Sequence, residues 1–220
     1  MSTDINSIFT NLGVNVSKIF KFDANKIIKL ENLRKNISSY NSKLTDEELN
    51  YALNFYEKEE VKKGELLIEA GQFVKHFYFV DKGCFCLFML KEGNEQVLEF
   101  YTESQVFTEL YAYLEEKPTS SFIKAMEDST LYKISKKNVA EVFDHAHQLE
   151  RFGRLMMQDY FLQTFRKTAH IRNRSNEERY LRLLAKRPDL FQRVPQYLIA
   201  SYLGITPVGL SKLRKRLAKI

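Results

Sequence analysis

The residues with the clearest chemistry lie near the C-terminus, where a short basic helix is predicted over residues 206–217. Thr206 fits a helix N-cap and Pro207 the first helical position. The apolar side chains of this helix share one face: Leu210, Leu213 and Leu217. The polar side chains fall outside that face: Ser211, Lys212, Lys215 and Arg216. Hydroxyl and ammonium groups on an exposed helix can contact the phosphates and base edges of a DNA groove.

A second short helix is predicted just before it, over residues 195–203, with Pro195 in its opening turn. Gly204 then fits the left-handed position that ends a helix. Two short helices joined by a glycine turn are typical of a helix-turn-helix, whose second helix enters the major groove. The alternative is a basic amphipathic helix pair at the end of a domain. We expect the candidate DNA contacts to be Gln196, Tyr197, Thr206, Ser211, Lys212 and Lys215.

The charge of the chain is distributed unevenly. Residues 166–220 contain 14 Lys and Arg against 3 Asp and Glu, a net of +11. The remaining 165 residues contain 20 against 25, a net of −5, which together give the overall +6. A basic segment on a mildly acidic body favours binding to a phosphate backbone. RNA and membrane surfaces would also be attracted, but together with the helix-turn-helix pattern the charge favours double-stranded DNA.

Length and composition limit the class of protein. A chain of 220 residues with 44% hydrophobic residues can bury a substantial core. Its two cysteines suit a reducing compartment. There is no run of eighteen apolar residues and no basic N-terminal region followed by an apolar block. We therefore expect a cytoplasmic protein with neither a membrane span nor a signal peptide.

The middle of the chain, from residue 60 to about 134, has the periodicity of short strands. Glycine turns separate the runs at Gly64, Gly71, Gly83 and Gly93. Strands over residues 95–100, 122–126 and 130–134 would complete an antiparallel β-roll or jelly-roll, with a short helical insertion near 109–116. Residues 33–59 have a helical pattern, with Thr45 as an N-cap. The predicted fold class is therefore α+β.

A long helix is predicted from Lys136 through Phe165, with apolar residues on more than one side. Such a helix needs two partners, and we expect these to be the β-roll and a second copy of the helix. Packing within a single subunit is the alternative. The candidate dimer contacts are Leu149, Phe152, Met156 and Tyr160. The predicted domains are an N-terminal extension of unknown role (1–29), the β-roll (30–135), the dimerisation helix (136–170) and the helix-turn-helix domain (171–220), with a hinge over 170–176.

The ordered set of motifs resembles the Crp/Fnr family of bacterial transcription regulators over residues 33–220. The motifs are K-K-G-E-L-L-I-E-A-G, then F-Y-F-V-D-K-G, then F-T-E-L, followed by the long helix and the terminal helix-turn-helix. The resemblance implies a cyclic nucleotide-binding-like β-roll and a winged-helix-type DNA-binding domain. It also implies a homodimer that binds palindromic promoter sites, responds to an effector and works with RNA polymerase.

The resemblance also indicates where an effector would bind. Members that bind cyclic nucleotides have a F-G-E turn and an arginine, followed by Ser or Thr, that clamps the phosphate. The matching residues here are Phe107, Thr108, Glu109 and Leu110 in the turn, and Thr119 and Ser120 at the clamp. Threonine cannot make the bidentate contact of arginine, and Lys124 is a poor substitute. We therefore expect no required cofactor, cyclic AMP binding that is weak or lost, and a different small-molecule effector if there is one. Glu109 could equally be a helix-capping acid.

Neither metal binding nor catalysis is expected. The iron–sulfur members of the family use four cysteines, whereas this chain has Cys84 and Cys86, whose spacing on a strand is typical of barrel core. The histidines are scattered: His76, His145, His147 and His170. A cupin-like enzyme is the alternative from another class, but it needs several ligands inside the barrel, and only His76 lies in that region.

The start of the terminal helix departs from the family. Members of the family place Arg and Glu there, whereas this chain has Pro207, Val208 and Gly209, which cannot form bidentate hydrogen bonds with bases. Lys212 is then the best candidate for reading a base. The interpretation is a homodimeric DNA-binding regulator with a diverged effector pocket. The alternative is an effector-binding module that has lost specific DNA binding and contacts protein.

Overall fold

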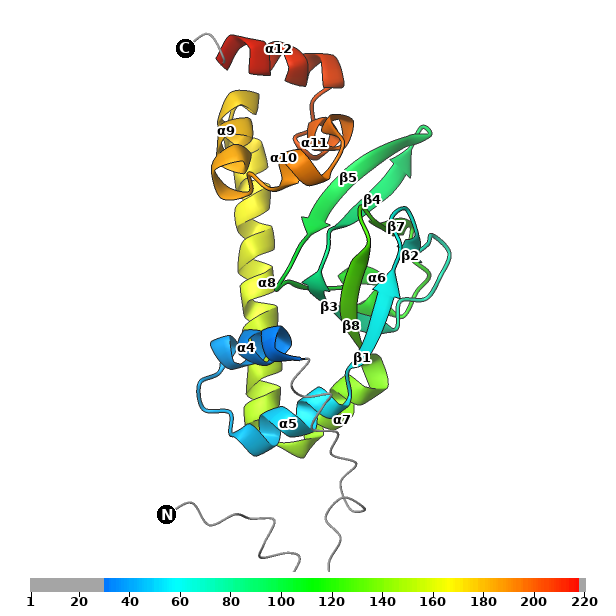
Figure 1. Cartoon of the computed structure of the whole chain (residues 1–220), viewed down its shortest axis with the longest axis vertical. Coiled ribbons are helices and arrows are strands. Elements are labelled where there is room, and N and C mark those ends of the chain that lie inside the picture. Colours follow the sequence, from blue (N-terminus) through cyan, green and yellow to red (C-terminus); the bar gives the residue numbers. More distant parts are fainter. Residues whose placement is uncertain (1–29, 218–220) are drawn as a thin grey trace, which may run out of the picture.

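The computed structural model describes residues 30–217, with side chains given for all of these except 170–173. The predicted N-terminal extension (1–29) and His170 as a side chain therefore lie outside the described residues. Figure 1 shows an elongated molecule in which one long helix joins a β-roll to a group of short helices. Within residues 30–217, no helix combines the length and apolarity needed to cross a membrane.

Two helices precede the β-roll, α4 (Glu31–Tyr40) and α5 (Asp46–Asn54). Thr45 caps α5 as predicted, since its hydroxyl accepts from the Glu48 amide while the Glu48 carboxylate accepts from the Thr45 amide. The buried side chains of these helices, including Leu33, Ile37 and Leu53, join a core that also contains part of α8. The helical pattern ends at Asn54, because the first strand begins at Glu57.

The β-roll consists of two four-stranded antiparallel sheets, with strand orders β1-β8-β3-β6 and β2-β7-β4-β5. The strands are β1 (Glu57–Val61), β2 (Leu66–Ile68), β3 (His76–Lys82), β4 (Phe85–Lys91), β5 (Asn94–Tyr101), β6 (Val106–Phe107), β7 (Ser121–Ala125) and β8 (Ser129–Ser135). A short helix, α6 (Leu110–Glu115), interrupts them. The predicted strands and the predicted insertion are therefore confirmed, with boundaries shifted by a residue or two.

The glycine at position 83 shows why the turns are specific. Gly83 has a φ of 119°, in the region that favours glycine, between β3 and β4. A Cβ atom built there would lie 2.4 Å from the Cβ of Ser129 and 2.8 Å from its Cα. Only glycine lets the β3–β4 turn approach the start of β8 this closely.

The long helix predicted from Lys136 is two helices, which corrects the prediction. The first, α7 (Lys136–His145), ends at Ala146, whose extended backbone (φ −154°, ψ 137°) breaks the helical hydrogen bonding. The second, α8, spans His147–Asn173. The apolar period continues across the break because α7 folds back against α8, so both helices contribute to one core. α8 continues to Asn173 and α9 begins at Asn176, so most of the segment expected to be a hinge is helical and only Arg174 and Ser175 lie between the two helices.

The C-terminal part contains α9 (Asn176–Lys186), α10 (Leu190–Arg193), α11 (Gln196–Tyr202) and α12 (Pro207–Leu217). Gly204 adopts a φ of 65° between the last two helices, as the turn prediction requires. The Thr206 hydroxyl accepts from the Gly209 amide at 3.1 Å and so caps α12. Leu210 and Leu213 are buried, which confirms the predicted apolar face. Between α9 and Leu217, the last described residue, there is no strand.

The C-terminal helices pack on the outer face of the sheet that contains β4 and β5 (Figure 1). Cys84 and Cys86 are fully buried there, in one cluster with Leu190 and Leu198 from the C-terminal helices. The prediction that the cysteines are buried is therefore confirmed, but the predicted place of burial, the core of the β-roll, is wrong. Both thiols lie beneath the C-terminal domain and not inside the β-roll, and burial raises the pKa of each.

Candidate effector and nucleic-acid sites

The interior of the β-roll is filled with aromatic rings. Phe107 stacks on Tyr101 with ring centres 4.6 Å apart, and it also contacts Tyr78 at 5.3 Å and Phe85 at 5.4 Å. All four side chains are buried. Burial raises the pKa values of the Tyr78 and Tyr101 hydroxyls, so both remain neutral. The space between the two sheets is thus occupied by four rings of this chain.

The turn expected to contact an effector is held by bonds within the chain. The buried Thr108 hydroxyl donates to the His76 carbonyl at 2.8 Å. The Glu109 carboxylate accepts from the Ala112 amide at 3.0 Å and caps α6, which begins at Leu110. Of the two roles considered for Glu109, helix capping is the one that its contacts show.

Of the two residues matched to the phosphate clamp, Thr119 already bonds within the chain. The Thr119 hydroxyl is buried and accepts from the Ser121 amide at 2.9 Å, while Ser120 is exposed. Lys124 lies on the outer face of the sheet, where its ammonium pairs with Glu95 at 2.5 Å and covers the Phe88 ring. Lys124 therefore points away from the clamp, and neither Thr119 nor Ser120 carries a cation.

The long helix faces this part of the β-roll through Tyr160. Burial, followed by the negative charges of Glu99 and Glu109, raises the pKa of the Tyr160 hydroxyl. Of the other predicted dimer contacts, Leu149 and Phe152 are buried among α4, α5 and the β-roll of the same subunit, and Met156 packs beside them.

Tyr160 is itself 37% exposed, but the most exposed apolar side chains of α8 are two phenylalanines. Phe161 and Phe165, four residues apart, are 67% and 65% exposed. Residues at this spacing share one face of a helix. Two exposed phenylalanines on one helix face are unusual for a monomer surface. The apolar periodicity of the sequence includes both phenylalanines. It does not show which helix face packs within the subunit and which stays exposed.

The terminal helix presents a second exposed stripe. Its residues recur at the spacing of one helix face and all are exposed: Val208, Ser211, Lys212 and Lys215. Gln196 of α11 joins Ser211 and Lys215 along one groove beside α9. Tyr197 does not join them, because its hydroxyl points to Glu95 of β5 at 3.4 Å. Val208 and Arg214 are also exposed on this helix, although the sequence pattern alone did not single them out as candidate contacts.

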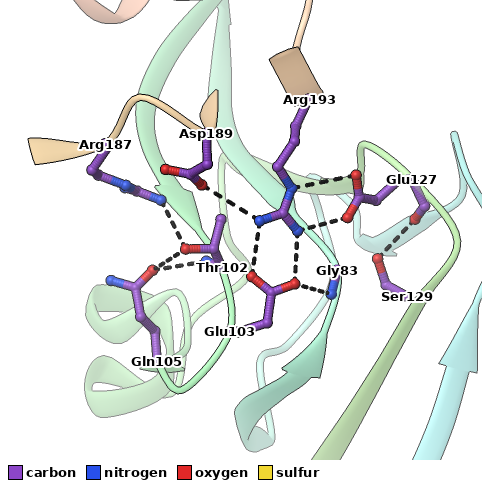
Figure 2. Close-up of polar contacts among 9 residues, drawn as sticks. All are labelled: Gly83, Thr102, Glu103, Gln105, Glu127, Ser129, Arg187, Asp189 and Arg193. Carbon is purple, nitrogen blue, oxygen red and sulfur yellow. Dashed lines mark hydrogen bonds and ion pairs between the residues drawn. The ribbon is translucent and has the colours of Figure 1, made fainter. Parts of the chain in front are cut away.

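A polar junction joins the C-terminal domain to the β-roll (Figure 2). The two terminal nitrogens of Arg193 bind the two carboxylate oxygens of Glu103, each at 2.8 Å. One of them also binds Glu127 at 2.6 Å, and the Gly83 amide donates to Glu103 at 2.8 Å. Bidentate contacts of this kind fix orientation as well as adding energy. Arg193 thus sets the position of α10, and with it the rest of the domain.

The Glu103 carboxylate stays charged at neutral pH. Burial alone would raise its pKa, but the hydrogen bonds from Arg193 and Gly83 outweigh burial and lower the pKa to about 2. A lowered pKa in the folded state stabilises the junction above the ordinary glutamate pKa, and that stabilisation is lost as the pH falls toward 2. The junction is therefore insensitive to pH in the neutral range.

Further contacts extend the junction along β5, an edge strand. The Ser201 hydroxyl accepts from the Val97 amide at 3.0 Å and donates to the Glu95 carbonyl at 2.8 Å. Arg187 donates to the Phe100 carbonyl at 2.8 Å. Backbone groups on the edge of β5 are thus hydrogen-bonded by side chains of the C-terminal domain. These bonds hinder pairing of the edge with another strand.

Replacing Arg193 by alanine is expected to loosen the docking of the C-terminal domain. The substitution leaves Glu103 and Glu127 without their cation, at a cost of about 1–2 kcal/mol after allowance for their partial exposure, roughly a tenfold shift. Hydrogen exchange of the Val97 amide, which bonds to Ser201, should accelerate by about that factor. The exposed Arg214→Ala variant is the control, and equal exchange in both variants would contradict this role.

No metal site is evident in the described part of the chain, where no three His, Cys, Asp or Glu side chains gather. The His145 ring stacks on Tyr51 at 3.5 Å, and His147 lies 3.7 Å from Glu150. His76 is on β3, and burial lowers its pKa.

Known proteins share both a sequence family and a fold with this chain. Residues 58–146 match the family described as the cyclic nucleotide-binding domain. FixK2 from Bradyrhizobium japonicum is similar in structure, with 15% identity over 74% of this chain and 85% of that chain and a TM-score of 0.62. The chain has the Crp/Fnr fold. The c-di-GMP-responsive regulator CLP from Xanthomonas campestris shares this Crp/Fnr fold, at 17% identity over 80% of this chain and 92% of that chain, with a TM-score of 0.61.

A third structure, the catabolite activator protein of Thermus thermophilus, aligns over 84% of this chain and 87% of that chain, at 18% identity and a TM-score of 0.51. No curated protein sequence matches this one. The likeness confirms the resemblance inferred from the sequence at the level of the Crp/Fnr fold. The identities are too low to transfer ligands or partners, which have to be argued from the residues of this chain.

Proposed function

We propose that the protein is a homodimeric DNA-binding transcription regulator whose effector is not a cyclic nucleotide. The observation that carries this proposal is the exposed stripe of α12, with Val208, Ser211, Lys212 and Lys215 on one face. The stripe lies opposite the buried leucines, at the end of the molecule furthest from α5 (Figure 1). A capped, basic helix with an exposed face suits a major groove.

The stripe combines two kinds of contact. Val208, which is 64% exposed in the first turn, suits the methyl group of thymine, whereas Lys212 and Lys215 suit phosphates or a guanine edge. Arg214 adds positive charge beside them. We infer that Val208 favours an A·T pair at its position through the thymine methyl, and that Lys212 reads a neighbouring guanine edge. Bidentate pairing with bases is not required.

The second copy would pack along α8. Phe161 and Phe165 provide an exposed apolar face near its middle, and Met157 extends this face by one turn. In a two-fold dimer this face meets itself, and the two copies of α12 lie at opposite ends of one symmetric surface. We therefore expect a palindromic site with half-sites about one helical turn apart, roughly 34 Å.

Cyclic AMP is expected not to bind. Four aromatic rings fill the β-roll interior, and Thr119 and Ser120 offer no cation to the phosphate. Calorimetric titration should give no measurable heat at millimolar cyclic AMP. The Thr119→Arg variant tests the cause, because a restored clamp without space should still fail to bind. Binding of cyclic AMP by the unaltered protein in the micromolar range would contradict the filled interior.

A protein-binding module that has lost DNA recognition is the second candidate function. It is favoured by Pro207 and Val208, an apolar start to α12 that also suits a protein surface. Selection of bound duplexes from a random pool separates the two. Enrichment of a palindrome supports the regulator, and recovery of no sequence at low salt supports the protein-binding module.

A further inference from the structure

An apolar cavity lies outside the β-roll, on the face of the β1-β8-β3-β6 sheet that α5, α7 and α8 cover. Its volume is about 280 Å³. Apolar side chains dominate its lining, among them Phe77, Ile134, Val142 and Met157. Much of its lining, such as Ile134 and Val142, packs with the helices, whereas Phe107 and Tyr101 pack inside the β-roll. Phe77 and Tyr113 lie at the boundary, since both also contact the interior cluster.

Two buried phenols break the apolar lining. Tyr56 is 9% exposed and Tyr113 is 4% exposed, and both line the cavity. Neither hydroxyl has a hydrogen-bond partner within the described residues, since the contacts of Tyr113 are its ring with Phe77 and Lys136 and its carbonyl with Lys136. Burial is the main cause that raises both pKa values, that of Tyr113 to about 12, so both remain donors at neutral pH.

Both hydroxyls are open to the cavity and are not enclosed by protein, so a ligand carbonyl would replace water as their hydrogen-bond acceptor. We propose that this cavity binds a small, largely apolar molecule whose single carbonyl oxygen accepts hydrogen bonds from Tyr56 and Tyr113. The charged lining residues, Glu150 and Arg154, are both exposed and of opposite sign, so the interior favours a neutral oxygen over a carboxylate.

Size limits the ligand further. A dry protein cavity of about 150 Å³ accommodates benzene, so one of 280 Å³ suits a molecule of about ten to twelve heavy atoms. A medium-length ketone, ester or lactone has this size and one acceptor. A complete cyclic nucleotide has many more polar groups than two phenols can satisfy.

The cavity is placed where a ligand would affect the rest of the molecule. Its walls come from the helix after the effector turn (Tyr113, Leu114), from α7 (Val139, Val142) and from α8 (Met157). Met157 lies one turn from Phe161 on the face proposed for dimerisation. As an effector site the cavity rests on the proposed regulatory function, but ligand binding is tested without DNA, so either can fail alone.

The test is calorimetric titration of the full-length protein with 2-nonanone, which has ten heavy atoms and one carbonyl. We expect a Kd on the order of 10–100 µM. Octyltrimethylammonium has a similar tail but no acceptor, and we expect it to bind at least about tenfold more weakly. Octanoate distinguishes a charged from a neutral oxygen, and tighter binding of octanoate than of the ketone would overturn the neutral assignment.

Variants separate the cavity from general hydrophobic binding. Tyr56→Phe should weaken 2-nonanone binding about tenfold by removing one donor. Tyr101→Phe, which removes a buried phenol outside the cavity, is the matched control and should leave binding unchanged. Val139→Phe, at a half-buried position, should fill the cavity and abolish binding with the fold retained. Absence of binding at 1 mM, equal weakening in the two Tyr→Phe variants, or unchanged binding in a folded Val139→Phe protein would each overturn the proposal.

Discussion

Replacing Phe161 and Phe165 by aspartate should convert the proposed dimer to a monomer and lower the affinity for a palindromic duplex at least about a hundredfold. Each ring is about two-thirds exposed in the subunit, so its burial by a second copy is available as association free energy. Aspartate removes that apolar area and places like charges opposite one another across the two-fold axis. Because each change occurs twice in the dimer, the loss of about 2 kcal/mol per buried ring is doubled.

Sedimentation equilibrium and fluorescence anisotropy with a duplex measure the two effects. Phe73→Asp is the matched control, since Phe73 is 57% exposed on the β-roll, away from α8. It should leave both the dimer and the DNA affinity unchanged. A double variant that remains dimeric would show that the dimer surface lies elsewhere. If the unaltered protein is monomeric at micromolar concentration, the proposal of a homodimer is wrong.

Replacing Lys212 and Lys215 by alanine is expected to reduce affinity for DNA by roughly one to two orders of magnitude, because four positive charges would leave the proposed dimer–DNA interface. The dependence of affinity on salt should become shallower, by about one unit of slope for each phosphate that is no longer bound. If Lys212 reads a base, its single replacement should cost more on the selected site than on random duplex. If it binds phosphate, the affinity should fall equally on both.

The control for this pair is Lys35→Ala on α4, whose ammonium is exposed and pairs with Glu31 four residues away. This variant removes a lysine of similar exposure from a helix far from α12. It therefore tests whether weaker DNA binding results from the lower net charge of the protein or from the loss of contacts made by α12. An unchanged salt dependence in the Lys212→Ala, Lys215→Ala protein would mean that α12 does not meet the phosphate backbone.

The sequence predicted well those features that depend on local chemistry. The capping box at Thr45, the left-handed turn at Gly204 and the cap at Thr206 all require particular residue types, and the structure has all three. The short strands were predictable for the same reason, because glycine turns and β-branched or aromatic runs define them.

Features that depend on tertiary contact were less predictable. The break at Ala146 carries no glycine or proline, so it follows from the packing of α7 on α8. Gly153 lies within α8, and a Cβ atom there would lie 2.3 Å from the Phe143 ring. Its role is to let α7 lie against α8, and no periodicity in the sequence reports that approach.

The candidate site likewise has features that local sequence predicts and features that depend on tertiary contacts. Motif matching predicted an effector turn and clamp positions, which stay predictions, but not the four rings that pack inside the β-roll, because these come from four separate strands. The cysteines were correctly predicted to be buried but assigned to the wrong side of the sheet. A period of two gives the shared face of Cys84 and Cys86, while the docking of α10 and α11 decides which face that is.

The proposed function depends most on α12 meeting duplex DNA. Titration of the unaltered protein with a mixed-sequence duplex at increasing salt measures this directly. We predict binding at low salt that weakens steeply and linearly on logarithmic axes, with a slope that corresponds to several bound phosphates. Absence of binding at low salt, or an affinity that does not change with salt, would contradict the proposed function.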